Sequence, residues 1–188
     1  MGQYDSKPST AISSLKTGAN SETKIKTQKT LDSGVLPQLT GTEKQVKFAE
    51  DIRSDFVGAM NTLMNLGEHE ELFDDVGSIG STASMVLDGF MSDKKYRSVL
   101  SDIDSAIDSF TFEKAQEIKA RYTDKAAGKA AVKKAKAENI ASAIRKHADV
   151  IQEACSQSSE SKWWITRRGL MASDALYLMG SLAKAAKP

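Results

Sequence analysis

The chain has 188 residues and a formal net charge of +1, with 40% hydrophobic but only 6% aromatic residues. This length suffices for one domain and a tail, and the scarcity of large side chains favours a helical bundle with small-residue contacts. The single cysteine, Cys155, excludes an internal disulfide, and no apolar run reaches the ~20 residues that a membrane-spanning helix needs.

The N-terminal segment, residues 1–38, has the composition of a disordered tail. It contains eleven Ser or Thr and five Lys, and its isolated apolar residues show no sustained period. Such a segment buries too little apolar surface to offset the entropy of ordering. We expect it to be disordered, or to order only on a partner, and we expect residues 39–188 to form a single helical domain.

The first predicted helix covers residues 43–66. Thr42 is a suitable N-cap, and Gln45 three residues later completes a capping box. Apolar residues at three- and four-residue spacing predict its buried face: Val46, Ala49, Ile52, Phe56, Met60 and Leu63. Gly67 stands where a left-handed residue would end the helix.

The remaining elements are also predicted to be helical. A loop with Gly77 and Gly80 is expected first. The predicted helices then cover 81–91, 93–110, 111–155 with a weak point at Gly128, and 173–184, with a polar break at 156–161. No segment shows the alternation of a strand. The predicted fold is therefore all-α, an irregular bundle of about five to six helices.

No catalytic motif stands out in the sequence. The glycine-containing segment 77–80 lacks the lysine and the preceding strand of a phosphate-binding loop. His69 has no second histidine four residues later, so the helical zinc spacing is absent. His147 and Cys155 lie two turns apart on one expected helix, and Cys155 is interpreted as a small core residue. We expect a non-enzymatic protein without catalytic residues, metal or cofactor.

Charge is distributed unevenly along the chain. Residues 67–113 carry eleven acids and three bases, whereas residues 113–148 carry ten bases and four acids. A predicted stripe of cations comprises Arg121, Lys125, Lys129, Lys133 and Lys136. Its first four members span about 18 Å of helix and can neutralise phosphates. The alternatives are an ordinary solvated Lys-Ala helix, or pairing with the acidic region within one molecule or across a dimer.

Both tryptophans, Trp163 and Trp164, are adjacent, and Arg167 and Arg168 follow them. Neighbouring helical residues diverge by about 100°, so we expect one indole to be buried and the other half-exposed. The aromatic and basic residues also suit stacking on nucleic-acid bases. Packing into the bundle, with one arginine reaching a surface acid, is the favoured interpretation.

Two short strings resemble a small helical module of phage and plasmid accessory proteins. The first is Thr-Gly-Thr-Glu-Lys-Gln followed by Phe-Ala-Glu-x-Ile-Arg, and the second is Trp-Trp-Ile-x-x-Arg. The matching residues are Thr42, Glu43, Lys44, Gln45, Ala49, Glu50, Ile52, Arg53, Trp163, Trp164, Ile165 and Arg168. Phe48 replaces the usual tryptophan. We expect the two strings to meet in space, with Phe48 packing on a C-terminal tryptophan.

The resemblance implies a mobile-element context and a bacterial cytoplasm, but no reaction. The expected function is a non-catalytic accessory protein that binds and inhibits a host nucleic-acid-processing machine, as an anti-CRISPR protein does. The alternative is direct DNA or RNA binding in replication or recombination. The expected partner is a host or phage protein or nucleoprotein complex. Contact of the basic stripe with nucleic acid and formation of a homo-oligomer are both possible, and no contact with a membrane is expected. The candidate contact residues are the five cations of the stripe together with Trp163, Trp164, Arg167 and Arg168.

Overall fold

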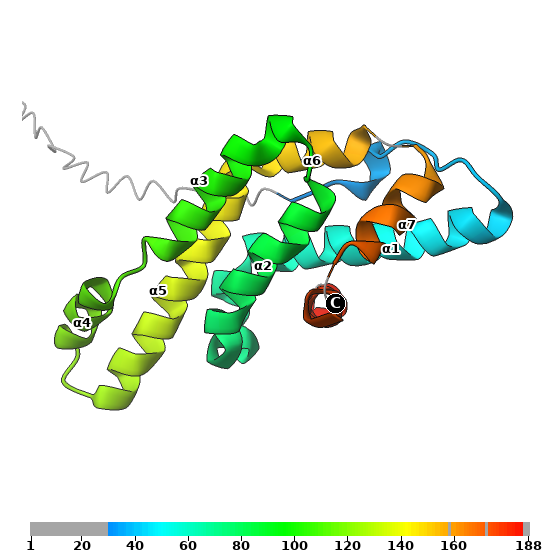
Figure 1. Cartoon of the computed structure of the whole chain (residues 1–188). Helices are drawn as coiled ribbons and strands as arrows, with labels where there is room; N and C mark the ends of the chain where they lie inside the picture. The colour runs from blue at the N-terminus through cyan, green and yellow to red at the C-terminus, as the bar shows by residue number, and fades with distance from the viewer. Residues whose placement is uncertain (1–29, 158, 172, 186–188) are drawn as a thin grey trace, which may run out of the picture.

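The computed structural model describes residues 30–157, 159–171 and 173–185 (Figure 1). Within these ranges the fold is all-α, as predicted, and its β-pairing is limited to one isolated bridge between Thr40 and Glu160. The helices are α1 (Glu43–Met64), α2 (Val76–Phe90), α3 (Arg97–Asp108), α4 (Phe112–Ala120), α5 (Lys125–Lys146), α6 (Ala148–Ser156), α7 (Ser161–Gly169) and α8 (Ser173–Ala185). Four short 3-10 helices connect them: η1 (Ser33–Val35), η2 (Leu66–Glu68), η3 (Glu70–Asp75) and η4 (Lys94–Tyr96).

The described residues contain eight α-helices, more than the five to six expected. The expected helix over 111–155 is divided into α4, α5 and α6, and α7 forms in addition. The first division lies before Lys125 rather than at Gly128, because the Asp124 side chain accepts N–H bonds from Ala126 and Ala127 and so caps a new helix. Gly128 lies inside α5 and is buried.

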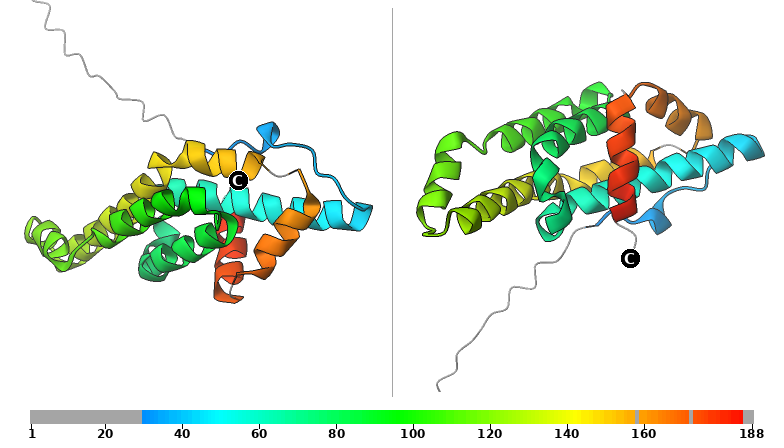
Figure 2. Two further views of the ribbon diagram at one scale, coloured as in Figure 1. Left: turned by 45° about the horizontal axis from the view of Figure 1, so that its top comes forward. Right: turned by 90° about the horizontal axis from the view of Figure 1, so that it is seen from below.

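Helix α1 forms the centre of the fold. Thr42 and Gln45 make the predicted capping box, and the buried residues include Ala49, Ile52 and Phe56. Figure 2 shows α8 crossing α1 at a steep angle, and α7 also packs against α1. The crossing is close at Gly58, because a Cβ added there would lie 3.2 Å from the Cα of Ala183.

The glycines of the segment after α1 do not act as predicted. Gly67 lies in η2 without a left-handed conformation, and α1 ends at Asn65 as its C-cap. Gly77 and Gly80 lie inside α2 rather than in a loop. A Cβ at Gly80 would lie 3.2 Å from Ile140 Cδ1, so the absence of a side chain permits close packing of α2 on α5.

Residues 30–38 belong to the fold, and the prediction of a tail that extends to residue 38 is wrong for them. Leu31 and Leu36 are buried in the core. The backbone N–H of Leu31 also donates to Asn61 Oδ1 at 2.7 Å, which attaches the segment to α1. Residues 1–29 of the predicted tail lie outside the described residues.

Helix α4 and the first half of α5 project away from the rest of the molecule (Figures 1 and 2). We call residues 112–134 the arm. No residue of α4 is buried, and Gly128 is the one buried residue of α5 before Ala137. A Cβ at Gly128 would lie 3.6 Å from the Cα of Lys119, so α4 and α5 approach closely there. None of the described helices has the length and apolar character needed to cross a membrane.

Candidate functional site

The chain reversal between α4 and α5 interrupts the predicted basic stripe. Arg121 is the C-cap of α4, whereas Lys125 is the first residue of α5. A stripe on one helix therefore begins at Lys125, and the prediction that it starts at Arg121 is wrong. Lys129 and Lys133 continue it at four-residue spacing along α5.

Two cations of the stripe have carboxylate partners. Arg121 donates to Glu117 at 2.6 Å on the exposed surface of α4. Lys133 pairs with Asp74 of η3, and this hydrogen bond lowers the pKa of Asp74. The pairing with the acidic region that the sequence left open is thus present within one molecule for Lys133. Among the other cations of the stripe, Lys125 and Lys129 are exposed and Lys136 is half-buried.

A groove of about 670 Å³, which we call the arm groove, runs along α5. Four alanines form its floor: Ala126, Ala127, Ala130 and Ala131. Phe73 of η3 and Tyr122 add aromatic side chains to the lining. A helix turns about 100° per residue, so Lys133, which contacts Asp74 of η3, and Gly128, which faces Tyr122, are separated by about 140° on one side of α5 and about 220° on the other. The four alanines fall on the wider side, so the floor covers the arc of α5 between η3 and Tyr122.

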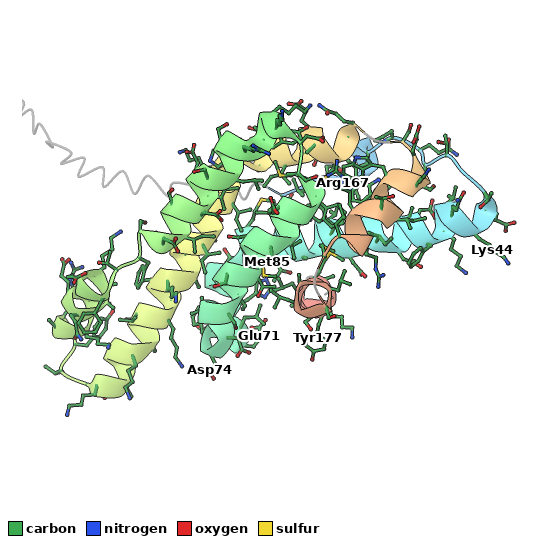
Figure 3. The ribbon with its side chains drawn as sticks, in the orientation of Figure 1. Lys44, Glu71, Asp74, Met85, Arg167 and Tyr177 are labelled. Carbon is green, nitrogen blue, oxygen red and sulfur yellow. The ribbon has the colours of Figure 1, made fainter. Side chains whose placement is uncertain are left out.

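Charged side chains line the same groove: Glu70, Asp74, Lys129, Lys133 and Lys134. Figure 3 shows Asp74 at the end of the η3–α2 segment next to α5. Because Asp74 and Lys133 pair with each other, they contribute no net charge to the lining. The exposed side chains of Lys129, Lys134 and Glu70 give the groove two positive charges and one negative charge.

Two aromatic residues of the arm were missed as candidates from the sequence. Phe112 is 71% exposed at the start of α4, and Tyr122 is 46% exposed beside the arm groove. Each stands next to a helix boundary, after Thr111 and before Asp124, in a segment where Ala replaces larger residues. An aromatic residue in an alanine-rich segment was the local signal that could have predicted their exposure, because alanines alone cannot bury a large ring.

The tryptophan pair divides as expected, and Trp164 is the buried member with 0% exposure. Its ring centroid lies 5.5 Å from that of Phe90 and 6.2 Å from that of Phe56. Trp163 is half-buried, with its centroid 5.0 Å from that of Trp164. The α1 ring that contacts Trp164 is Phe56, not Phe48 as we expected, because Phe48 lies on the exposed side of α1.

The arginines after the tryptophans engage neighbouring elements. Arg167 donates to Asp93 at 3.2 Å, and its guanidinium lies 5.1 Å from the Trp163 centroid. The Arg168 guanidinium lies 5.4 Å from the Phe48 ring, so the two strings meet in space as predicted. A smaller groove of about 340 Å³ borders Trp163 and Arg167.

The two predicted contact surfaces are not brought together. The arm and α7 lie towards opposite ends of the molecule in both figures (Figures 1 and 2). At the α7 end Arg167 and Arg168 lie over aromatic rings, and Arg167 also pairs with an acid, whereas on the arm Lys125, Lys129 and Lys134 remain exposed. The arm is therefore the stronger candidate for a contact surface.

The histidines and the cysteine occupy separate environments. Burial lowers the pKa of His147, whose Nε2 lies 3.9 Å from Asp102 Oδ2. His69 contacts Glu71 at 2.9 Å. Cys155 is buried, and desolvation raises the pKa of its thiol to about 12. In the part of the chain that the structure describes, no three His, Cys, Asp or Glu side chains are grouped to hold a metal ion.

Comparison with known proteins gives no assignment for this fold or this surface. No protein-family model, no curated protein and no solved structure matches the chain with significance.

Proposed function

We propose that this chain is a non-catalytic accessory protein of a mobile genetic element in the bacterial cytoplasm. It binds and inhibits a host nucleic-acid-processing machine, with a CRISPR–Cas nuclease as the most specific case. Support for the mobile-element context comes from the two strings around Thr42–Arg53 and Trp163–Arg168. Support for binding comes from one observation: the arm projects from the fold and presents exposed lysines and aromatic rings.

The composition of the arm suits a binding surface better than a structural one. The arm carries seven Lys or Arg and three Asp or Glu, a net charge of +4. Exposed aromatic side chains are a feature of protein interfaces, where aromatic residues supply much of the binding energy. Phe112 and Tyr122 are the aromatic residues available for such contacts.

Direct nucleic-acid binding is the second candidate function. The observation that favours it is the spacing of Lys125 and Lys129, whose exposed side chains follow one face of α5. Phosphate binding by these lysines would weaken steeply with salt. Glu70 lies at the same surface, and its negative charge opposes a phosphate backbone, whereas Asp74 is paired with Lys133.

Affinity capture from phage-infected or plasmid-bearing cells, with and without nuclease treatment, tests the proposed function. A protein partner that resists nuclease supports it, and loss of every partner on nuclease treatment contradicts it. The variant K125E/K129E tests the arm, and K44E/K47E is the matched control, because both variants change the charge equally. Lys44 lies at the end of the molecule opposite the arm (Figures 1 and 3). Retention of the partner by K125E/K129E would exclude these lysines as contacts.

A salt series on a duplex and a single-stranded oligonucleotide tests the second candidate. Affinity that collapses between low and moderate salt, and that K125E/K129E reduces, supports direct nucleic-acid binding. Binding that K44E/K47E reduces by the same factor indicates a non-specific charge effect. Absence of binding at low salt contradicts the second candidate.

A further inference from the structure

We infer, on the basis of the proposed function, that the arm groove binds one amphipathic helix of a protein partner. The apolar face of that helix lies on the alanine floor. Acidic side chains of the partner face Lys129 and Lys134, and a basic side chain faces Glu70. The occupant is thus a helix of mixed charge with an excess of acids.

The helical form of the occupant follows from the backbone of the groove. The floor belongs to α5, whose N–H and C=O groups form helical hydrogen bonds along Lys125–Lys146. An extended peptide would find no free strand edge there and would leave its own polar backbone groups unpaired on an apolar surface. A helix satisfies its backbone internally, so it can be placed on the alanines without that loss.

The dimensions of the groove suit about two turns of helix. Its lining runs along α5 from Ala126 to Lys134, which corresponds to about 12 Å at ~1.5 Å per residue. Small side chains at a helix contact allow interaxial distances near the lower end of the usual ~8–10 Å range. Tyr122 is exposed beside this floor, where it can contact apolar residues at positions i, i+3 or i+4 and i+7 of the occupant, whereas Phe73 lines the groove but is mostly buried in the core.

The charges of the groove distinguish this occupant from nucleic acid. Asp74 and Lys133 already neutralise each other. Two positive charges then remain from Lys129 and Lys134, and one negative charge from Glu70. A phosphate backbone carries no positive group to face Glu70, whereas a helix with acids and one base can match all three charges. The same observations therefore favour a protein helix over DNA or RNA.

The substitution Ala130→Arg separates the two occupants. Ala130 is an exposed residue of the floor, and Arg is a good helix former, so the fold is expected to persist. The long side chain fills the groove and blocks a docked helix, while its charge favours phosphate. Ala120→Arg is the matched control, because Ala120 is exposed on α4 and does not line the groove.

The experiment uses the full chain and a displayed library of 14-residue amphipathic helices with a fixed apolar stripe and flanking positions drawn from Glu, Lys and Gln. Enriched peptides are expected to carry more Glu than Lys. By fluorescence anisotropy, A130R is expected to weaken the best peptide at least about tenfold and A120R less than about twofold, where tenfold corresponds to ~1.4 kcal/mol. The variant K129E/K134E should weaken it about tenfold, and K114E/K119E, with the same charge change on α4, much less.

Three results would overturn the proposal that the arm groove binds a helix. The first is that selection on the intact chain enriches no peptide beyond those enriched on A130R. The others are that the best peptide binds A130R and the intact chain equally, or that K129E/K134E and K114E/K119E weaken its binding equally. Tighter oligonucleotide binding by A130R, with displacement of the selected peptide, would assign the groove to nucleic acid instead. These failures differ from failure of the proposed function. A nuclease-resistant partner that A130R retains contradicts the groove alone, whereas capture of no protein partner by the intact chain contradicts the proposed function.

Discussion

Arg167 of α7 donates a hydrogen bond to Asp93, 3.2 Å away, in the connection between α2 and η4. The same guanidinium lies over Trp163 at 5.1 Å from its ring centroid, and the Arg167 side chain is only 14% exposed. A residue that the sequence offered for partner contact therefore contributes to packing within the fold. The ion pair and the stacked ring together attach α7 to the start of the α3 segment.

Removal of the buried indole is expected to be the most damaging change at α7. Trp164→Ala deletes a side chain with 0% exposure that contacts Phe56 and Phe90, so we expect a loss of about 3–5 kcal/mol in the free energy of unfolding. Trp163→Ala is the control, since its half-buried ring should cost clearly less. Urea unfolding followed by circular dichroism measures both, and equal costs would contradict the assignment of Trp164 as the core member.

Two glycines in helices are expected to respond in opposite directions to alanine. Gly180→Ala meets no atom within 4 Å and should stabilise α8 by about 0.5–1 kcal/mol, because alanine is the better helix former. Gly58→Ala places a Cβ 3.2 Å from the Cα of Ala183 and should destabilise the α1–α8 crossing by about 1–3 kcal/mol. Thermal unfolding measures both, and a gain from Gly58→Ala would show that α8 shifts enough to accommodate the added methyl group.

Local signals predicted a large part of the fold, and contacts between distant segments account for most of the rest. The capping box of Thr42 and Gln45 depends on residues three apart, and it is observed as predicted. The burial of Leu31 and Leu36 could not be inferred from their own segment, because the surfaces that cover them come from elsewhere in the chain. Gly67 and Gly80 were misinterpreted for the same reason: their neighbours, Glu138 and Ile140, are about seventy and sixty residues away.

The candidate site was only partly accessible from sequence. The four-residue spacing of Lys125, Lys129 and Lys133 identified one face of α5. The arm groove also requires Phe73 and Asp74 of η3, which no periodicity connects to α5. The Asp124 cap that separates Arg121 from the stripe carried a local signal, an acid before an alanine-rich run, and the predicted helix passed over it.

The Cys155 thiol is expected to be unreactive in the folded protein. Burial raises its pKa to about 12, so the thiolate scarcely forms near neutral pH, and Ellman's reagent should react only after urea unfolds the chain. The thiol of the unfolded chain ionises near pH 9. Stability attributable to Cys155 is therefore complete below that pH and lost as the pH rises towards 12. The difference in stability between the intact chain and Cys155→Ala should shrink over this range, and a constant difference would contradict the raised pKa.

The arm is expected to open locally more readily than the core. None of the residues of α4 is buried, and its packing is mainly against α5, whereas α1 buries nine residues. Hydrogen-exchange mass spectrometry should show faster exchange for the backbone amides of α4 than for those of α1. Equal protection of the two helices would contradict the claim that the arm opens separately from the core. A captured partner bound to the arm should slow exchange there.

Nuclease-treated affinity capture with A130R and its control A120R shows whether the arm groove holds a protein partner. We expect the intact chain and A120R to retain the same protein partner and A130R to lose it, with all three chains showing the same helical content by circular dichroism. Retention of that partner by A130R would contradict binding in the arm groove, and its loss from every chain on nuclease treatment would contradict the proposed function.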